Sequence, residues 1–135
     1  MLLCYNTLMK NCKITITNES EAPYSYDGYW ECSDGIHKLT YVHEDDGQKY
    51  DYELTASHDQ LKIKRSGDAK IAILIKPNEK TSCIIRLPQG RLVGDVETFS
   101  YALKEDEGTL HIDVTYDMIF GGERNCRKLT IETKT

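Results

Sequence analysis

The stretch GTLHIDVTYDM, residues 108–118, decides the fold of this chain. Its apolar residues, from Leu110 through Met118, all share one parity, and polar residues stand between them. Successive side chains of a β-strand point to opposite faces, whereas a helix repeats its apolar face every three to four residues. The stretch therefore predicts a β-strand with one buried face and one solvent-exposed face.

Shorter stretches at residues 13–17, 61–65, 71–75 and 129–131 alternate in the same way. Turn signals separate them, among them Asp-Gly at 34–35 and 46–47 and Gly-Gly at 121–122. Glycine adopts the positive φ that tight hairpin loops require, and aspartate tolerates it. Apart from a short helix expected at Tyr5–Lys10, no helical period is sustained. The pattern predicts an all-β protein of roughly eight to ten antiparallel strands.

These strands favour closure into a β-barrel. Each amphipathic strand needs one buried face, and a closed sheet supplies that face while leaving no exposed edge. A barrel of about eight strands is either filled by side chains or holds one small ligand. The chain has 135 residues, enough for one domain with a core of its own. Because Met9 offers a second natural start, we expect residues 1–11 to be an N-terminal extension and residues 12–135 to be a single barrel domain.

Composition restricts the partners and the compartment. The net charge is −5, and the densest basic run, Lys62, Lys64 and Arg65, alternates with apolar residues as on the wet face of a strand. We therefore expect no nucleic-acid partner. The sequence shows no secretory signal and no apolar run of about 20 residues, which predicts a cytoplasmic protein without a membrane span. The five cysteines form no C-x-x-C pair, so we expect reduced thiols, several of them in the core.

The residue pattern does not predict an enzyme, a metal site or a cofactor. The four histidines form no closely spaced pair. His37 and His43 share a strand face but stand roughly 20 Å apart, too far to bind one metal ion. The acidic clusters at 44–46 and 105–107 lack the calcium-loop pattern and are interpreted as solvated hairpin tips. No nucleophile stands with a base and an orienting group.

Several segments together resemble the YwiB-like family of bacterial proteins. They are YDGYW at 26–30, LTY at 39–41, LKIKRSG at 61–67, LPQG at 87–90 and the stretch at 108–118. Their order and spacing carry the resemblance, although Gln89 stands where the family tends to have an aromatic residue. The resemblance implies a calycin-like barrel, similar to lipocalins and fatty-acid-binding proteins. It implies no activity, and a fold alone does not define one.

Arg65 is the first candidate for a ligand-binding residue. It shares parity with Leu61 and Ile63, so its side chain is expected to point into the barrel. A buried guanidinium requires a partner, which is either a protein group or the acidic group of a ligand held bidentately. The alternative is an arginine at the strand end, beside the Ser66-Gly67 turn, that reaches solvent.

Tyrosines supply the other candidates, since the chain has nine tyrosines and two phenylalanines. Tyr41, Tyr101 and Tyr116 fall on apolar parities, and a ring with a polar tip suits the lining of a pocket. The alternative is that these rings only pack in the core. The sequence thus predicts a non-enzymatic barrel that binds a small apolar or acidic ligand. The alternative function is an interaction module with a filled barrel, whose surface contacts a protein partner or a second copy.

Overall fold

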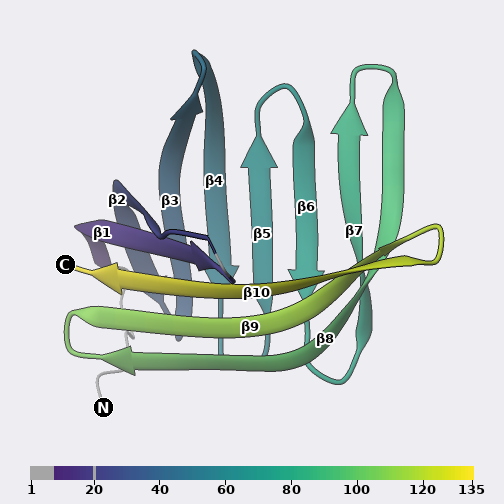
Figure 1. The fold of residues 1–135 in the computed structure, drawn as a ribbon. Coiled ribbons are helices and arrows are strands. Elements are labelled where there is room, and N and C mark those ends of the chain that lie inside the picture. The colour runs from purple at the N-terminus through teal and green to yellow at the C-terminus, as the bar shows by residue number, and fades with distance from the viewer. Residues whose placement is uncertain (1–7, 20) are drawn as a thin grey trace.

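Antiparallel strands are the regular elements of the computed structural model, which describes residues 8–19 and 21–135 (Figure 1). They are β1 (Leu8–Asn18), β2 (Tyr24–Ser33), β3 (Ile36–Asp45), β4 (Gln48–Ala56), β5 (Leu61–Ser66), β6 (Lys70–Ile75), β7 (Lys80–Leu87), β8 (Gly90–Asp106), β9 (Thr109–Phe120) and β10 (Glu123–Lys134). No helix occurs among the described residues. The helix expected at Tyr5–Lys10 is wrong at residues 8–10, which belong to β1, and residues 5–7 lie outside the described part.

The strands close into a barrel in the order β1-β10-β9-β8-β7-β6-β5-β4-β3-β2. Neighbours in sequence are neighbours in space, and β1 closes the barrel by pairing with both β2 and β10. Figure 1 shows β8, β9, β10 and β1 running across β3 to β7, so that the lumen lies between two crossed layers. The predicted all-β antiparallel barrel is confirmed.

The long strand β8 joins the two layers. It has 17 residues, of which the first half pairs with β7 and the second half with β9. The register with β9 shifts between Thr98 and Ser100, where Phe99 is left exposed. An extra residue of this kind bends a strand and increases its twist. The bend carries β8 out of the layer of β5 to β7 and into that of β9 and β10 (Figure 1).

The barrel begins earlier than the sequence indicated. Residues 8–11 pair with residues 29–32 of β2, so the boundary expected at residue 12 falls inside β1. Only residues 1–7 of the expected extension lie outside the described part. The alternation in β1 is clear from Cys12 onward, and nothing in the preceding residues marks them as strand.

The core consists of the inward-facing side chains of all ten strands. Ile14, Leu39, Leu61, Ile112 and Ile131 have no exposed surface. Along β9, every second residue from Leu110 to Tyr116 is buried, as the alternation predicts. Asp117 is buried on the outward parity of the same strand, since Arg124 of β10 lies 3.2 Å from its carboxylate.

A glycine in β2 permits close packing at the wall of the barrel. Gly28 stands opposite Tyr41 of β3, whose ring fills the space beside it. A Cβ atom at Gly28 would contact the carbonyl oxygen of Thr40 and lie 2.7 Å from Ile14 Cδ1. Real Cβ atoms do not approach backbone oxygens that closely, so this site requires glycine.

Gly28→Ala is therefore expected to lower the free energy of unfolding by about 1–3 kcal/mol, because the added methyl overpacks the wall. Urea denaturation measures the change. The neighbouring Asp27→Ala removes a side chain that is 91% exposed and should change stability by less than about 0.5 kcal/mol. Equal stability of the two variants would contradict the packing argument.

Candidate functional site

The inner face of β3 shows how the two ends of the barrel differ. His37, Leu39, Tyr41 and His43 alternate along this face from one end to the other. At the His37 end, which we call the filled end, buried side chains contact one another, and His37 is 1% exposed. The His43 end contains a cavity of about 320 Å³. His37 and His43 therefore share one face of β3, as the sequence predicted.

Part of the cavity lining is polar or aromatic, and the other part, which we call the floor, is aliphatic. Its polar or aromatic lining consists of Asn18, Tyr24, Tyr26, Tyr41, His43, Tyr52, Arg65 and Tyr116. Its aliphatic lining consists of Ile16, Leu54, Ile63, Ile71, Ile73, Leu129 and Ile131. No carboxylate is among these residues. In a protein with a net charge of −5, a cavity that contains a cation and no anion is a local exception.

Arg65 is the cation of the cavity. It lies near the end of β5, and its guanidinium carbon stands 4.8 Å from the centre of the Tyr50 ring. The Nε–H group is buried and donates to no acceptor among the described residues. An unpaired buried donor costs about 1–3 kcal/mol, and more when it is charged. The arginine is thus held inside the lumen with hydrogen-bonding capacity unused.

Stacked tyrosines form one wall of the cavity. Tyr41 and Tyr52 are directly opposite in the β3–β4 register, and their ring centres are 4.8 Å apart with an interplanar angle of 5°. Tyr26 of β2 stacks on the other side of Tyr41 at 4.5 Å. The three rings thus form one stacked row along β2, β3 and β4 that lines the cavity.

Two phenols of this wall, Tyr41 and Tyr26, remain protonated. Burial raises the pKa of Tyr41, and the neighbouring phenols of Tyr52 and Tyr26 raise it further. Burial, with Tyr52 and Tyr24, likewise raises the pKa of Tyr26. Protonated hydroxyls serve as hydrogen-bond donors. The Tyr26 hydroxyl lies 3.0 Å from Nδ1 of His43, which ties the wall to the mouth of the cavity.

The structure places three of the four sequence-predicted residues in this cavity. Arg65, Tyr41 and Tyr116 line it, and Tyr116 is buried. Tyr101 does not line it, because its hydroxyl donates to the backbone oxygens of Ser57 and Gln60 at the filled end. The sequence analysis missed His43 and Tyr52 as lining residues. Their parity with Tyr41 and Leu54 would have indicated them.

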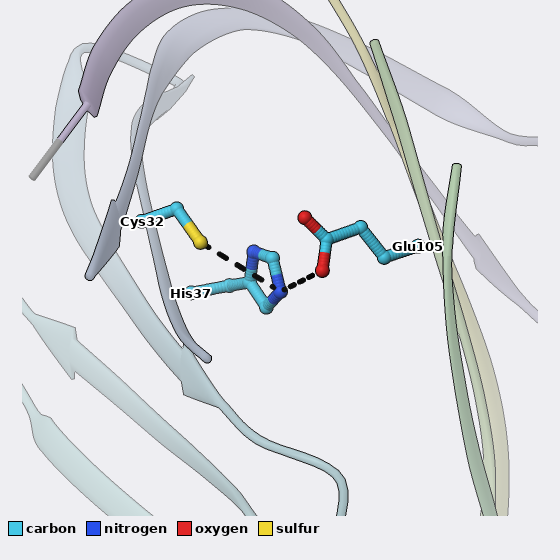
Figure 2. Close-up of side chains that lie close together, drawn as sticks. All are labelled: Cys32, His37 and Glu105. Atoms are coloured by element: carbon cyan, nitrogen blue, oxygen red, sulfur yellow. Dashed lines mark hydrogen bonds and ion pairs between the residues drawn. The ribbon is translucent and has the colours of Figure 1, made fainter. Parts of the chain in front are cut away.

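A second polar cluster lies at the filled end (Figure 2). Glu105 reaches across the lumen from β8, and its Oε2 lies 3.2 Å from Nε2 of His37 on β3. The Cys32 sulfur lies 3.9 Å from the same nitrogen. On the other side of the ring, the Trp30 indole N–H donates to Nδ1 at 3.0 Å.

These contacts fix the protonation of His37. An indole N–H only donates, so Nδ1 must be the unprotonated nitrogen. The single ring proton is then on Nε2, which donates it to the Glu105 carboxylate. Protonation of Nδ1 would set two N–H groups against each other. Burial is the main reason that the pKa of His37 is lowered, and it outweighs the attraction of Glu105.

The same contacts argue against a metal-binding or catalytic role for this cluster. The three ligand atoms lie within 4.8 Å of one another, a spacing that suits a metal ion. A metal on Nε2 would, however, require the ring proton to move to Nδ1, which faces the Trp30 donor. A catalytic triad would need a free thiol and the carboxylate on different ring nitrogens, whereas the Cys32 sulfur is disulfide-bonded and lies beside Nε2, the nitrogen that contacts Glu105. The cluster is best explained as a structural contact that joins β3 and β8 across the lumen.

The cysteines correct one expectation. Cys12, Cys83 and Cys126 are free thiols, the first two of them buried, as the sequence indicated. Cys32 is disulfide-bonded, so the expectation of a reduced thiol is wrong there. Cys4 lies outside the described residues. The sequence showed no spacing that would single out Cys32, because disulfide partners are defined by spatial proximity.

The fold and the cavity together define a class of protein, the closed antiparallel β-barrels that contain an internal cavity. Within that class, the chain belongs to the family described as Domain of unknown function (DUF1934), whose profile matches residues 8–131. The crystal structure of the ywiB protein from Bacillus subtilis has the same fold, with a TM-score of 0.76 at 20% identity over 95% of this chain and 92% of that one. No curated protein matches the sequence.

The described residues include no helix that is long and apolar enough to span a membrane.

Tyr101→Phe tests the structural role assigned to that tyrosine. The change removes the donor to two backbone oxygens and should lower the free energy of unfolding by about 1–2 kcal/mol. Tyr29→Phe is the matched control, since that ring is 51% exposed, and it should cost less than about 0.5 kcal/mol. Urea denaturation compares the two. A similar small cost for both would show that the Tyr101 hydroxyl does not brace the β4–β5 loop.

His37 should make folding stability depend on pH. Its pKa is lowered from the ordinary 6.5 in the folded state, so below 6.5 the unfolded chain binds more protons than the folded chain. The free energy of unfolding therefore falls as pH drops from 6.5 toward the folded-state pKa. His37→Gln, which can still accept from Trp30 and donate to Glu105, should remove this contribution.

Trp30→Phe tests whether the indole donor adds to the effect of burial on the pKa of His37. Without the indole donor, Nδ1 can take a proton with less opposition, so the loss of stability in acid should be smaller than in the unmodified protein. Urea denaturation at pH 7.5 and pH 5.5 measures all three proteins. An unchanged pH dependence in His37→Gln would show that another group is responsible.

Proposed function

We propose that this protein is a binding barrel, without catalytic activity, for a small molecule that has one acidic group and an apolar body. The observation that carries the proposal is the Arg65 guanidinium, held in a cavity free of carboxylates with its Nε–H group buried and unpaired. A carboxylate or similar oxyanion of a ligand would satisfy this donor. Arginine binds such groups bidentately through two parallel N–H groups.

The rest of the cavity suits such a ligand. Tyr52 is directly opposite Arg65 in the β4–β5 register, and Tyr26 and Tyr41 line the same cavity. Their hydroxyl groups are candidate donors to the same oxyanion. The aliphatic floor can receive the apolar body. A volume of about 320 Å³ is at the lower end of the range typical of small-molecule sites. The size, charge and polarity of the cavity therefore all suit a small, partly apolar acid.

Nothing in the lining supports a reaction. His43 is its only histidine, it contacts Tyr26, and no carboxylate of the lining orients it. Catalysis by acid–base or nucleophilic chemistry requires such groups in contact with one another. The alternative of a completely filled barrel fits the His37 end only, because the other end contains the cavity.

Calorimetric titration with decanoate, decanol and decyltrimethylammonium tests the proposal. These probes share a chain and differ in charge. We expect decanoate to bind most tightly, and Arg65→Met to weaken its binding by about tenfold or more while leaving decanol unchanged. Lys104→Met removes an exposed cation from β8 and should preserve decanoate binding. Thermal unfolding verifies that both variants are folded.

Native mass spectrometry of the protein from its own host supplies the complementary result. A non-covalent adduct that is lost on denaturation, and that Arg65→Met fails to retain, would support the proposal and give the ligand mass. The proposal fails if decanoate binds no better than decanol and the purified protein carries no adduct.

A further inference from the structure

The outer face of β5 to β8 contains cations that face one another without partners. Lys70 is directly opposite Arg86 in the β6–β7 register, and Arg86 is directly opposite Arg91 in the β7–β8 register. All three side chains are exposed. We call these three residues the cationic strip. Like charges directly opposite on a sheet destabilise it, so the fold gains nothing from this arrangement.

Some exposed cations elsewhere on the barrel pair with carboxylates. Lys38 lies 3.1 Å from Glu53, Lys49 lies 3.7 Å from Glu44, and Arg124 lies 3.2 Å from Glu97. Among the described residues, no member of the cationic strip forms an ion pair. The strip therefore has its full charge available to an external anion, although the protein as a whole is acidic.

The surface beside the strip is hollowed and partly apolar. A hollow of about 380 Å³ lies there, lined by Lys64, Arg65, Lys70 and Arg86 and by no carboxylate. Ala72 and Ile84 contribute to its lining, and the register continues from Ile84 to Val93, which is 58% exposed. The surface thus offers positive charge around an apolar row.

Two simpler explanations do not account for this surface. Lysines often protect the open edge of a sheet from pairing with another chain, but a closed barrel has no such edge. A symmetric dimer through this face would bring each strip against an identical strip, because a two-fold interface uses the same patch on both copies. Repulsion between the two strips opposes that dimer.

We propose that this face docks an acidic segment of a partner protein, in which glutamate or aspartate residues alternate with aliphatic ones. The carboxylates would pair with the cationic strip and Lys64, and the aliphatic side chains would cover Ala72, Ile84 and Val93. Nucleic acid fits less well, because no aromatic side chain lines the hollow for a base to stack on. A membrane fits less well, because Ala72 and Ile84, which line the hollow, are only half-exposed.

The test measures fluorescence anisotropy of a short labelled peptide in which glutamate pairs alternate with leucines. The triple variant Lys70→Glu, Arg86→Glu, Arg91→Glu should weaken binding by about tenfold or more. The control Lys104→Glu, Lys128→Glu, Lys134→Glu changes the net charge equally at exposed positions on β8 and β10 and should change binding by less than about twofold. Binding should also weaken as salt is added.

Companion probes decide the class of partner. These are the same peptide with glutamine for glutamate, a polyglutamate peptide, a single-stranded oligonucleotide and vesicles containing an anionic lipid. The proposal requires the peptide with both glutamate and leucine to bind best. It is overturned if that peptide does not bind, if the control triple weakens binding as much, or if the oligonucleotide or the vesicles are preferred. Decanoate binding by the triple variant should stay intact, since Arg65 is unchanged.

Discussion

Closure of the barrel by β1, which pairs with both β2 and β10, imposes the constraint on which the rest of the structure depends. In a closed antiparallel sheet, every second side chain of every strand points into the lumen. A polar residue on that parity cannot turn to solvent without a change of register. It must find a partner across the lumen, lie near an open end, or bind something from outside.

The two ends of the lumen meet this constraint differently. At one end, Glu105 of β8 reaches His37 of β3, and Trp30 satisfies the remaining ring nitrogen. Both ring nitrogens of His37 have hydrogen-bond partners, so the imidazole has no free position for a ligand. At the other end, Arg65 has the same inward parity but no carboxylate beside it. Arg65 is half-buried, and its buried Nε–H group donates to no acceptor among the described residues, which is why this end is the functional candidate.

The sequence predicted which face each residue occupies and not its position along the barrel axis. Alternation placed Tyr41, Tyr101 and Tyr116 inside, and all three lie on the inner face of their strands. The end of the barrel at which each lies depends on strand register and on the shift at Phe99, which local pattern does not reveal. Tyr101 consequently braces the filled end instead of lining the cavity. The contact of His37 with Glu105 joins distant strands and left no local signal.

Arg65 connects the two binding surfaces inferred from the structure. It lines the inner cavity and also the hollow on the outer face of β5 to β7. A guanidinium presents one fork to one carboxylate at a time. If an acidic segment occupies the hollow and draws Arg65 outward, the inner cavity loses its only cation. The two occupancies would then oppose each other, and by thermodynamic linkage each would weaken the other by the same factor.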